Sequence, residues 1–214
     1  LSADQGKLLQ ASPGALVLDV AAPMADGDRL YRDALRLVHA LASELGGLAW
    51  DDETRQVFSP EAWKAQRIDT LSEVLDLEDH VTMHAYLDGE MTRVVTLGMR
   101  KFGLPDVVAN QVAGSSSRQM GSLINLVCQT LHESGSISED SSLSVDAARL
   151  GNVKARQSQQ KRLMSGASGR ATLRVRFVEP AEGDADNRLI ELVFSGTDET
   201  SQVRQSAILK QIYG

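Results

Sequence analysis

The stretch Val81–Val112, VTMHAYLDGEMTRVVTLGMRKFGLPDVVANQV, contains the clearest fold signal in the chain. Asp88-Gly89 separates two segments rich in β-forming residues, and Asp-Gly is favoured in two-residue hairpin loops whose central residues take positive φ. We therefore expect a central β-hairpin over residues 81–97, with Leu87 paired to Glu90 across the loop. A third apolar run follows and predicts a further strand, so the sheet should be built around this hairpin.

This register divides the hairpin into two faces. The more apolar face, with Met83 opposite Val94, is expected to contact the core. The other face places His84 opposite Arg93 as a cross-strand polar pair. We do not expect His80 and His84 to bind a metal, because four residues of a strand span about 13 Å. Both rings therefore cannot reach one ion.

A turn bracketed by glycines follows the hairpin. We expect at least one of Gly98 and Gly103 to take positive φ, since glycine is the usual residue where the chain needs that conformation. Phe102 should then point inward, while Arg100 and Lys101 point outward.

Helical and strand patterns flank this region. A short β-rich run at 15–20 predicts a first strand, and helical spacing over 31–45 predicts a helix that ends at Gly46-Gly47. Ser59-Pro60 is a helix-start pattern, with Ser as cap and Pro at the first position. The serines at 115–117 should cap a helix with one apolar stripe, formed by Met120, Leu123, Ile124, Val127 and Leu131.

These elements predict an α+β fold with an antiparallel or mixed sheet and helices mainly on one face. Residues 1–133 should form an α+β core unit. Residues 134–170 are rich in serine and glycine and locally basic, and we interpret them as an irregular connection with room for one helix near 153–164. Residues 171–214 should form a strand pair and a helix. The second strand of that pair is apolar on both faces, so this part should dock on the core unit.

Composition narrows the functional classes. The 214 residues carry a formal net charge of −7, with 42% hydrophobic and 24% charged residues, as in an ordinary globular protein. The negative charge argues against a nucleic-acid partner, because phosphate binding depends on basic surface. No apolar run approaches the roughly 20 residues of a membrane span. The glycines fit no phosphate-binding motif, so we expect no cofactor. No two histidines are placed to converge and no loop has the spacing of oxygen ligands, so we expect no metal.

Cys128 is the only cysteine, so no intrachain disulfide can form. Its place beside an apolar helical stripe predicts a buried, unreactive thiol. The acid-rich segment Glu182–Asn187 does not have the ligand spacing of a calcium loop, and we interpret it as a solvated turn.

Two functional hypotheses follow. The leading one is a non-enzymatic binding or protein-interaction module, because the sequence contains no convergent set of catalytic residues. The alternative is an enzyme whose site lies at the turn Gly98–Asp106 or at the acidic turn Asp51–Glu53. A deep pocket with pKa-shifted groups would favour the enzyme, and a shallow surface would favour the binding module. Five charged residues are surface candidates, namely Asp51, Asp52, Arg93, Arg100 and Lys101.

Three segments carry a family resemblance: GLAWDDETR at 47–55, TLGMRKFGLPD at 96–106 and EGDADNRLI at 182–190. Together they resemble uncharacterised bacterial exported proteins that end in a YegJ-like domain of unknown function. The resemblance implies that this chain corresponds to the N-terminal portion, located in the periplasm or cell envelope. It also implies a protein partner or the C-terminal domain as the contact, and it assigns no catalytic residue. The residues themselves are equally compatible with the cytoplasm.

Overall fold

The computed structural model describes residues 3–21, 23, 26–134, 137–138, 141–184, 186–194 and 197–214, without the side chains of 198 and 199. The chain forms two compact units, Leu1–Leu71 and Ser72–Gly214. The boundary therefore precedes the hairpin and does not coincide with the predicted connection at 134–170. Of that segment, 135–136 and 139–140 lie outside the described residues, and the rest contains β6 (Ser142–Asp146) and α5 (Val153–Lys161).

Unit 1 is a small α/β assembly. Its elements are α1 (Ala3–Ala11), α2 (Gly27–Leu45), β1 (Ala49–Asp51), β2 (Gln56–Phe58), α3 (Pro60–Trp63) and a π-helical turn (Lys64–Ile68). The predicted strand at 15–20 is wrong, because these residues are exposed and adopt no regular structure. A β-rich run forms a strand only where another strand supplies the ladder.

The caps of unit 1 agree with the sequence prediction. Gly46 ends α2 in the left-handed conformation at φ 64°, and the Ser59 hydroxyl accepts a hydrogen bond from the Ala62 amide at the start of α3. α3 brings Trp63 into the core, where its indole Nε1 donates to the Leu35 carbonyl over 2.9 Å. The core therefore depends on the junction between α2 and α3.

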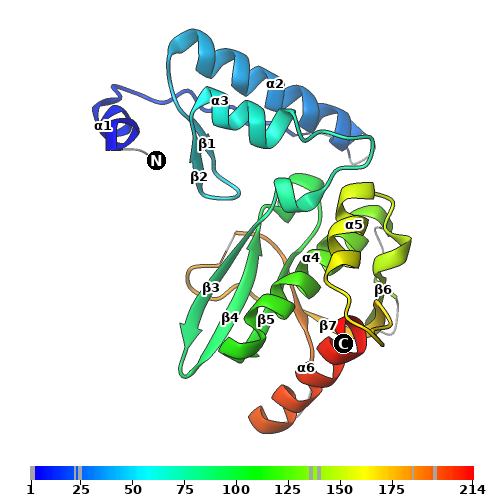
Figure 1. Cartoon of the computed structure of the whole chain (residues 1–214). Helices are drawn as coiled ribbons and strands as arrows, with labels where there is room; N and C mark the ends of the chain where they lie inside the picture. The colour runs from blue at the N-terminus through cyan, green and yellow to red at the C-terminus, as the bar shows by residue number, and fades with distance from the viewer. Residues whose placement is uncertain are drawn as a thin grey trace. The chain divides into compact units, whose positions relative to one another are not determined.

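Unit 2 contains a six-stranded mixed sheet in the order β3-β4-β5-β8-β7-β6. Only the β5–β8 pair is parallel among these neighbours. The bounds are β3 (Thr82–Asp88), β4 (Met91–Leu97), β5 (Asp106–Val112), β7 (Arg170–Val178), β8 (Leu189–Leu192), α4 (Ser117–Ser134) and α6 (Asp198–Tyr213) (Figure 1). The α+β class and the mixed sheet are as predicted. The pairing of β8 with β5 places the C-terminal strands in the same sheet as the hairpin.

The helices of unit 2 lie on one face of the sheet. α4 packs against β5, α6 contacts both α4 and β5, and α5 packs on α4. Met83 of β3 lies against Gly121 of α4, which identifies the helix-bearing face. The stripe predicted on α4 is fully buried there. We call the opposite face of the sheet the open face, because no helix of unit 2 covers it.

The hairpin exists, but its predicted register is shifted by two residues. Gly89 and Glu90 form the loop, Asp88 pairs with Met91, and Arg93 lies opposite Tyr86 rather than His84. Gly89 alone supplies the positive φ of the loop, at 64°. Glycine is favoured at the first central position of a type II′ hairpin turn, and this preference outweighs the Asp-Gly signal.

The expectation of one buried hairpin face is also only partly met. Val94 and Val95 are adjacent on β4, point to opposite faces, and are both buried. Val95 packs with Val108, Leu189 and Val178 on the open face. This part of the open face is therefore closed over, and the connection between β7 and β8 lies nearby, behind β3 and β4 in Figure 1.

Both glycines of the turn after the hairpin have positive φ, 113° at Gly98 and 68° at Gly103. Replacing Gly98 by alanine should therefore lower the free energy of unfolding by about 1 kcal/mol or more. The matched control is Gly114→Ala, where the added Cβ meets open space and φ is not positive. Thermal denaturation of both variants checks the prediction, and equal stabilities would contradict it.

Candidate functional site

A row of polar side chains crosses the open face on five neighbouring strands. We call it the polar row, and each residue stands opposite the next in the strand register or is hydrogen-bonded to it. Alternate residues of a strand point to the same face, so the row follows from the strand order. Its members are Tyr86 on β3, Arg93 on β4, Asn110 on β5, Glu191 on β8 and Arg176 on β7.

One end of the row is closed by Asp184 from the β7–β8 connection. Arg93 Nη2 donates to Asp184 Oδ2 over 2.5 Å, and the Tyr86 hydroxyl donates to Asp184 Oδ1 over 3.1 Å. The Asp184 side chain is fully buried, and that of Arg93 is only 11% exposed. The Ala181 amide also donates to Asp184 and fixes the bend of the connection.

The middle of the row continues this network. Arg93 Nη1 donates to Asn110 Oδ1, and Asn110 Nδ2 donates to Glu191 Oε1 over 2.9 Å. Arg176 Nε donates to Glu191 Oε2 over 2.6 Å. Arg176 remains exposed, so the network leads from a buried ion pair to a cation in contact with solvent.

The charges of the row are mutually stabilised. Burial alone would raise the pKa of Asp184, but hydrogen bonds from Arg93, the Ala181 amide and Tyr86 hold that pKa below its usual value. Burial raises the pKa of the Tyr86 phenol; Asp184 acts in the same direction, while Arg93 opposes it. These groups are fixed in one protonation state near neutral pH, which suits recognition rather than proton transfer.

The acidic turn of unit 1 does not form a carboxylate pair. Asp51 is buried, accepts the Thr54 amide, and lies 3.6 Å from Arg67. Asp52 is exposed and accepts a hydrogen bond from the Trp50 indole. The two carboxylates therefore point into different environments, as adjacent residues at a strand end do.

The turn Gly98–Asp106 is held together by Asp106, which is completely buried. Its carboxylate accepts hydrogen bonds from the Thr96 hydroxyl, the Met99 amide and the Asn187 side chain. Burial raises the pKa of Asp106 against these three hydrogen bonds. The carboxylate organises the turn and does not face solvent.

The two basic candidates of this turn differ in exposure. Arg100 is exposed, and its Nη1 donates to the Asp186 carbonyl over 3.0 Å. Lys101 is half-buried, and its charge lowers the pKa of Asp106. Arg100 thus points outward as expected, whereas Lys101 does so only in part. Arg100 therefore contacts the β7–β8 connection, and Lys101 lies close enough to Asp106 to act on its charge.

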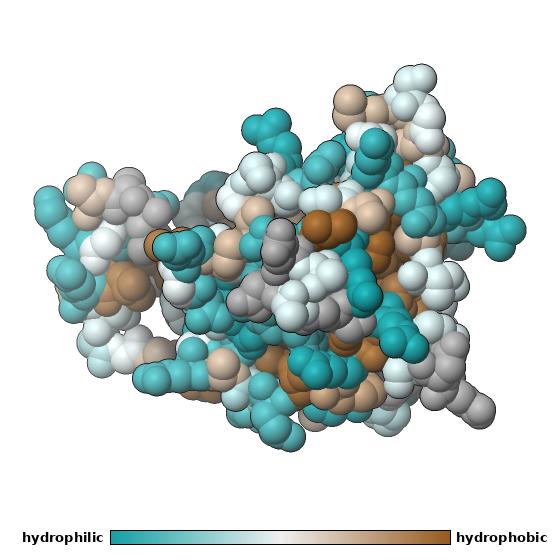
Figure 2. All heavy atoms as spheres, turned by 90° about the horizontal axis from the view of Figure 1, so that it is seen from below, coloured by the Kyte–Doolittle hydropathy of each residue, from teal (hydrophilic) through white to brown (hydrophobic). Residues whose placement is uncertain are grey.

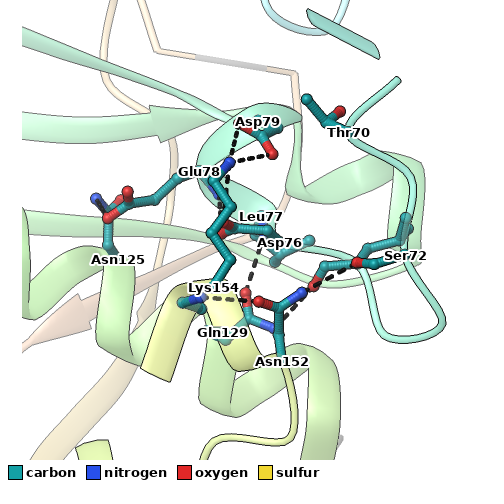
Figure 3. Close-up of polar contacts among 12 residues, drawn as sticks. Thr70, Ser72, Asp76, Leu77, Glu78, Asp79, Asn125, Gln129, Asn152 and Lys154 are labelled. Carbon is teal, nitrogen blue, oxygen red and sulfur yellow. Dashed lines mark hydrogen bonds and ion pairs between the residues drawn. The ribbon is translucent and has the colours of Figure 1, made fainter. Parts of the chain in front are cut away.

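A second polar cluster serves the fold of unit 2 (Figure 3). Gln129 of α4 accepts the Leu77 amide and donates to the Leu75 carbonyl. Asn152 caps α5 and also donates to the Val74 carbonyl, and Lys154 binds both oxygens of Asp79. These contacts attach the segment before the hairpin to α4 and α5. They satisfy its backbone, so we assign the cluster a structural role.

Sequence reasoning identified Arg93 but missed its partners. The sequence places Asp184 in a solvated turn, and Asn110 and Glu191 carry no local signal beyond their place among apolar strand residues. A polar residue that interrupts a strand otherwise buried on both faces is the signal that points to Glu191.

Three further findings concern the described residues. They contain no group of three His, Cys, Asp or Glu arranged to hold a metal ion. Every helix among them is too short or too polar to cross a membrane. A shallow hollow of about 330 Å³ in unit 1 is lined mainly by uncharged residues: Gln5, Leu8, Ser43, Gly46, Gly47, Leu48, Ser59, Pro60 and Glu61.

Comparison with known proteins adds no family. No protein-family model, curated protein or solved structure matches this chain. The functional reading of the polar row therefore depends on its own geometry.

Cys128 is buried, as its place beside the stripe on α4 predicts. Burial raises the pKa of its thiol, and the nearby charge of Asp106 raises it further. We therefore expect very slow native-state labelling by a polar thiol reagent, because the thiolate is the reactive form. The measurement is labelling followed by mass spectrometry, with the urea-unfolded chain as control. Labelling of the folded protein as fast as the unfolded control would refute the prediction.

Proposed function

We propose that this chain is a non-enzymatic protein-interaction module and that the open face of unit 2 is its binding surface. The observation that supports this most strongly is the polar row, which crosses a sheet face that no helix of unit 2 covers. Arg176 and Tyr86 at its two ends reach solvent, while the members between them are held by hydrogen bonds. The buried and half-buried members between them thereby hold the two exposed ends in place, and preorganised groups lose little conformational entropy on binding.

The chemistry of the ionisable groups favours binding over catalysis. Asp106 and Asp51, the acids of the two turns where an enzyme site was considered, are engaged in contacts that hold those turns. One face of the molecule, drawn in Figure 2, carries hydrophilic and apolar residues side by side. Interfaces of non-obligate complexes are about as apolar as the rest of the surface, so a reversible partner needs no large apolar patch.

Site-specific photo-crosslinking tests the proposal. A crosslinking amino acid at His84 or Thr172, both exposed on the open face, should give a defined adduct in cells that express the protein. The control position is Val203, which is also exposed, at 63%, on helix α6. Adducts from the open face and not from Val203 support the proposal. Equal labelling from all three positions, or none from any, contradicts it.

The compartment is part of the same proposal. The sequence resemblance implies the periplasm or the cell envelope. Fractionation of cells that express the full-length gene product should recover the protein with envelope or periplasmic markers. Recovery with cytoplasmic markers would contradict this part and leave the binding surface unaffected.

A further inference from the structure

Strand β7 presents arginines at alternating exposed positions. Burial alternates from Arg170 to Arg176, with the even-numbered residues exposed and Ala171, Leu173 and Val175 buried against the helices. Arg170, Arg174 and Arg176 therefore share the open face, with Thr172 between the first two. We call these three arginines the arginine stripe.

The neighbours of the stripe are mostly hydroxyl groups. Ser142 of β6 pairs with Arg174, and Ser144 pairs with Thr172, their hydroxyl oxygens lying 3.3 Å apart. Small hydroxyl side chains leave room above the sheet and offer further hydrogen bonds to a ligand.

Two acids adjoin the ends of the stripe, and each has a contact of its own. Glu191 binds Arg176 through the Nε atom. Asp146 stands opposite Arg170 in the register, caps the Ala148 amide, and lies 3.5 Å from Arg149. Arg174 in the middle has no ion pair or side-chain hydrogen bond within the part of the chain that the structure describes. Among the described residues, therefore, no carboxylate contacts the guanidinium at the centre of the stripe.

The stripe contrasts with the charge of the whole chain. The formal net charge is −7, whereas the three arginines of this described strand outnumber the two acids beside them, Glu191 and Asp146, and leave a local positive excess. Such a contrast steers an anionic partner to one place and repels it elsewhere.

The spacing of the stripe favours an extended chain as its ligand. Alternate residues of a strand are about 7 Å apart, so Arg174 and Arg176 match acids at alternate positions of an extended peptide. A single-stranded nucleic acid would instead require aromatic side chains for base stacking. The described residues of β6 and β7 next to the stripe supply serine and threonine on this face.

We propose that the arginine stripe binds an acidic segment of a partner protein in extended conformation, with carboxylates at alternating positions. This inference rests on the proposed function and identifies the class of partner. Arginine is suited to the role because its guanidinium forms paired hydrogen bonds with carboxylates.

The test uses the full chain and a fluorescent peptide in which Glu and Thr alternate. Binding is measured by fluorescence anisotropy at low and at physiological salt. The comparison peptide has the same composition with all glutamates in one block. Wild-type protein should bind the alternating peptide more tightly, and binding should weaken with salt. Equal affinity for both peptides would refute recognition of the alternating pattern.

The variant Arg170→Gln/Arg174→Gln should weaken binding of the alternating peptide by about three- to tenfold, as expected for two exposed charge pairs. Arg176 is left unchanged because it binds Glu191. The control Arg118→Gln/Lys161→Gln removes the same charge from exposed positions on α4 and α5 and should bind as wild type.

Further arms separate the remaining outcomes. Arg174→Lys should keep the electrostatic attraction to the alternating peptide but bind it with lower affinity. Unchanged circular dichroism confirms that each variant is folded. The inference is overturned in favour of a different partner if oligothymidine or anionic vesicles bind more tightly than the alternating peptide and the Arg170→Gln/Arg174→Gln variant weakens that binding. If crosslinks from the open face persist in the stripe variant at wild-type yield, the inference fails while the binding function stands. If the wild type gives no such crosslinks, the proposed function fails.

Discussion

Replacing Arg93 by methionine should lower the free energy of unfolding of unit 2 by about 3 kcal/mol. The substitution keeps the length of the side chain but leaves the fully buried Asp184 carboxylate without its cation. The loss is large because a buried charge whose partner is removed keeps its desolvation cost. Both tryptophans lie in unit 1, so the readout is taken from unit 2 itself. Amide exchange of β4 and β5 in the full chain is the measurement.

Two variants control this prediction. Arg149→Met removes an arginine that is 87% exposed and pairs with Asp146, and it should cost less than about 1 kcal/mol. The double variant Arg93→Met/Asp184→Asn should be more stable than Arg93→Met alone, because no charge is then left unpaired. Equal losses of unfolding free energy for Arg93→Met and Arg149→Met would show that the buried Arg93–Asp184 pair contributes no more to stability than an exposed pair.

The same pair gives a pH dependence. Because the pKa of Asp184 is lower in the folded chain than in the unfolded chain, its stabilisation is fully present above the unfolded value of about 3.9. It is lost as pH falls through the folded pKa. The difference in unfolding free energy between wild type and Asp184→Asn should therefore become smaller as the pH falls from about 3.9 through the folded pKa of Asp184. A difference that stays constant would contradict the assignment.

Replacing Asp106 by alanine should destabilise unit 2 by about 2 kcal/mol or more, because buried donors lose their acceptor. The Met99 amide and the Thr96 hydroxyl both donate to this carboxylate in a fully buried setting. The loss should be greatest at the turn, so exchange of the Met99 amide is the local readout.

The matched control is Asp186→Ala, a neighbouring aspartate whose side chain is fully exposed. It should change stability by less than about 0.5 kcal/mol. Asp106→Asn keeps one carbonyl oxygen for the Met99 amide, so it should cost less than Asp106→Ala. An Asp106→Ala variant as stable as wild type would show that the turn Gly98–Asp106 does not depend on the carboxylate. Asp106 would then again be a candidate catalytic residue.

Local signals accounted for much of the fold. The caps at Gly46 and Ser59, the buried stripe of α4 and the positive φ of Gly98 and Gly103 each depend on a few neighbouring residues, and each is present. The hairpin register failed by two residues because Gly89 has φ 64° and begins the loop. The choice between two adjacent turn positions is decided by pairing along the whole hairpin.

The candidate residues were predictable only one at a time. Arg93 could be placed on the polar face of the hairpin, but Asp184 lies 91 residues further along the chain. Asp51 and Asp106 could be recognised as acids near turns, yet their burial depends on contacts with Arg67 and Asn187 from other segments. Burial decides whether such an acid reacts or only organises structure.

The sequence by itself determined the α+β class, the helices α2 and α4 and the buried thiol of Cys128, because periodicity and capping act over a few residues. The tertiary structure decided the strand order, in which β8 enters beside β5, and with it the polar row. Strand order depends on pairing between residues far apart in the chain. The two-residue period of a strand tells which of its residues share a face. It does not tell which other strand lies beside it in the sheet.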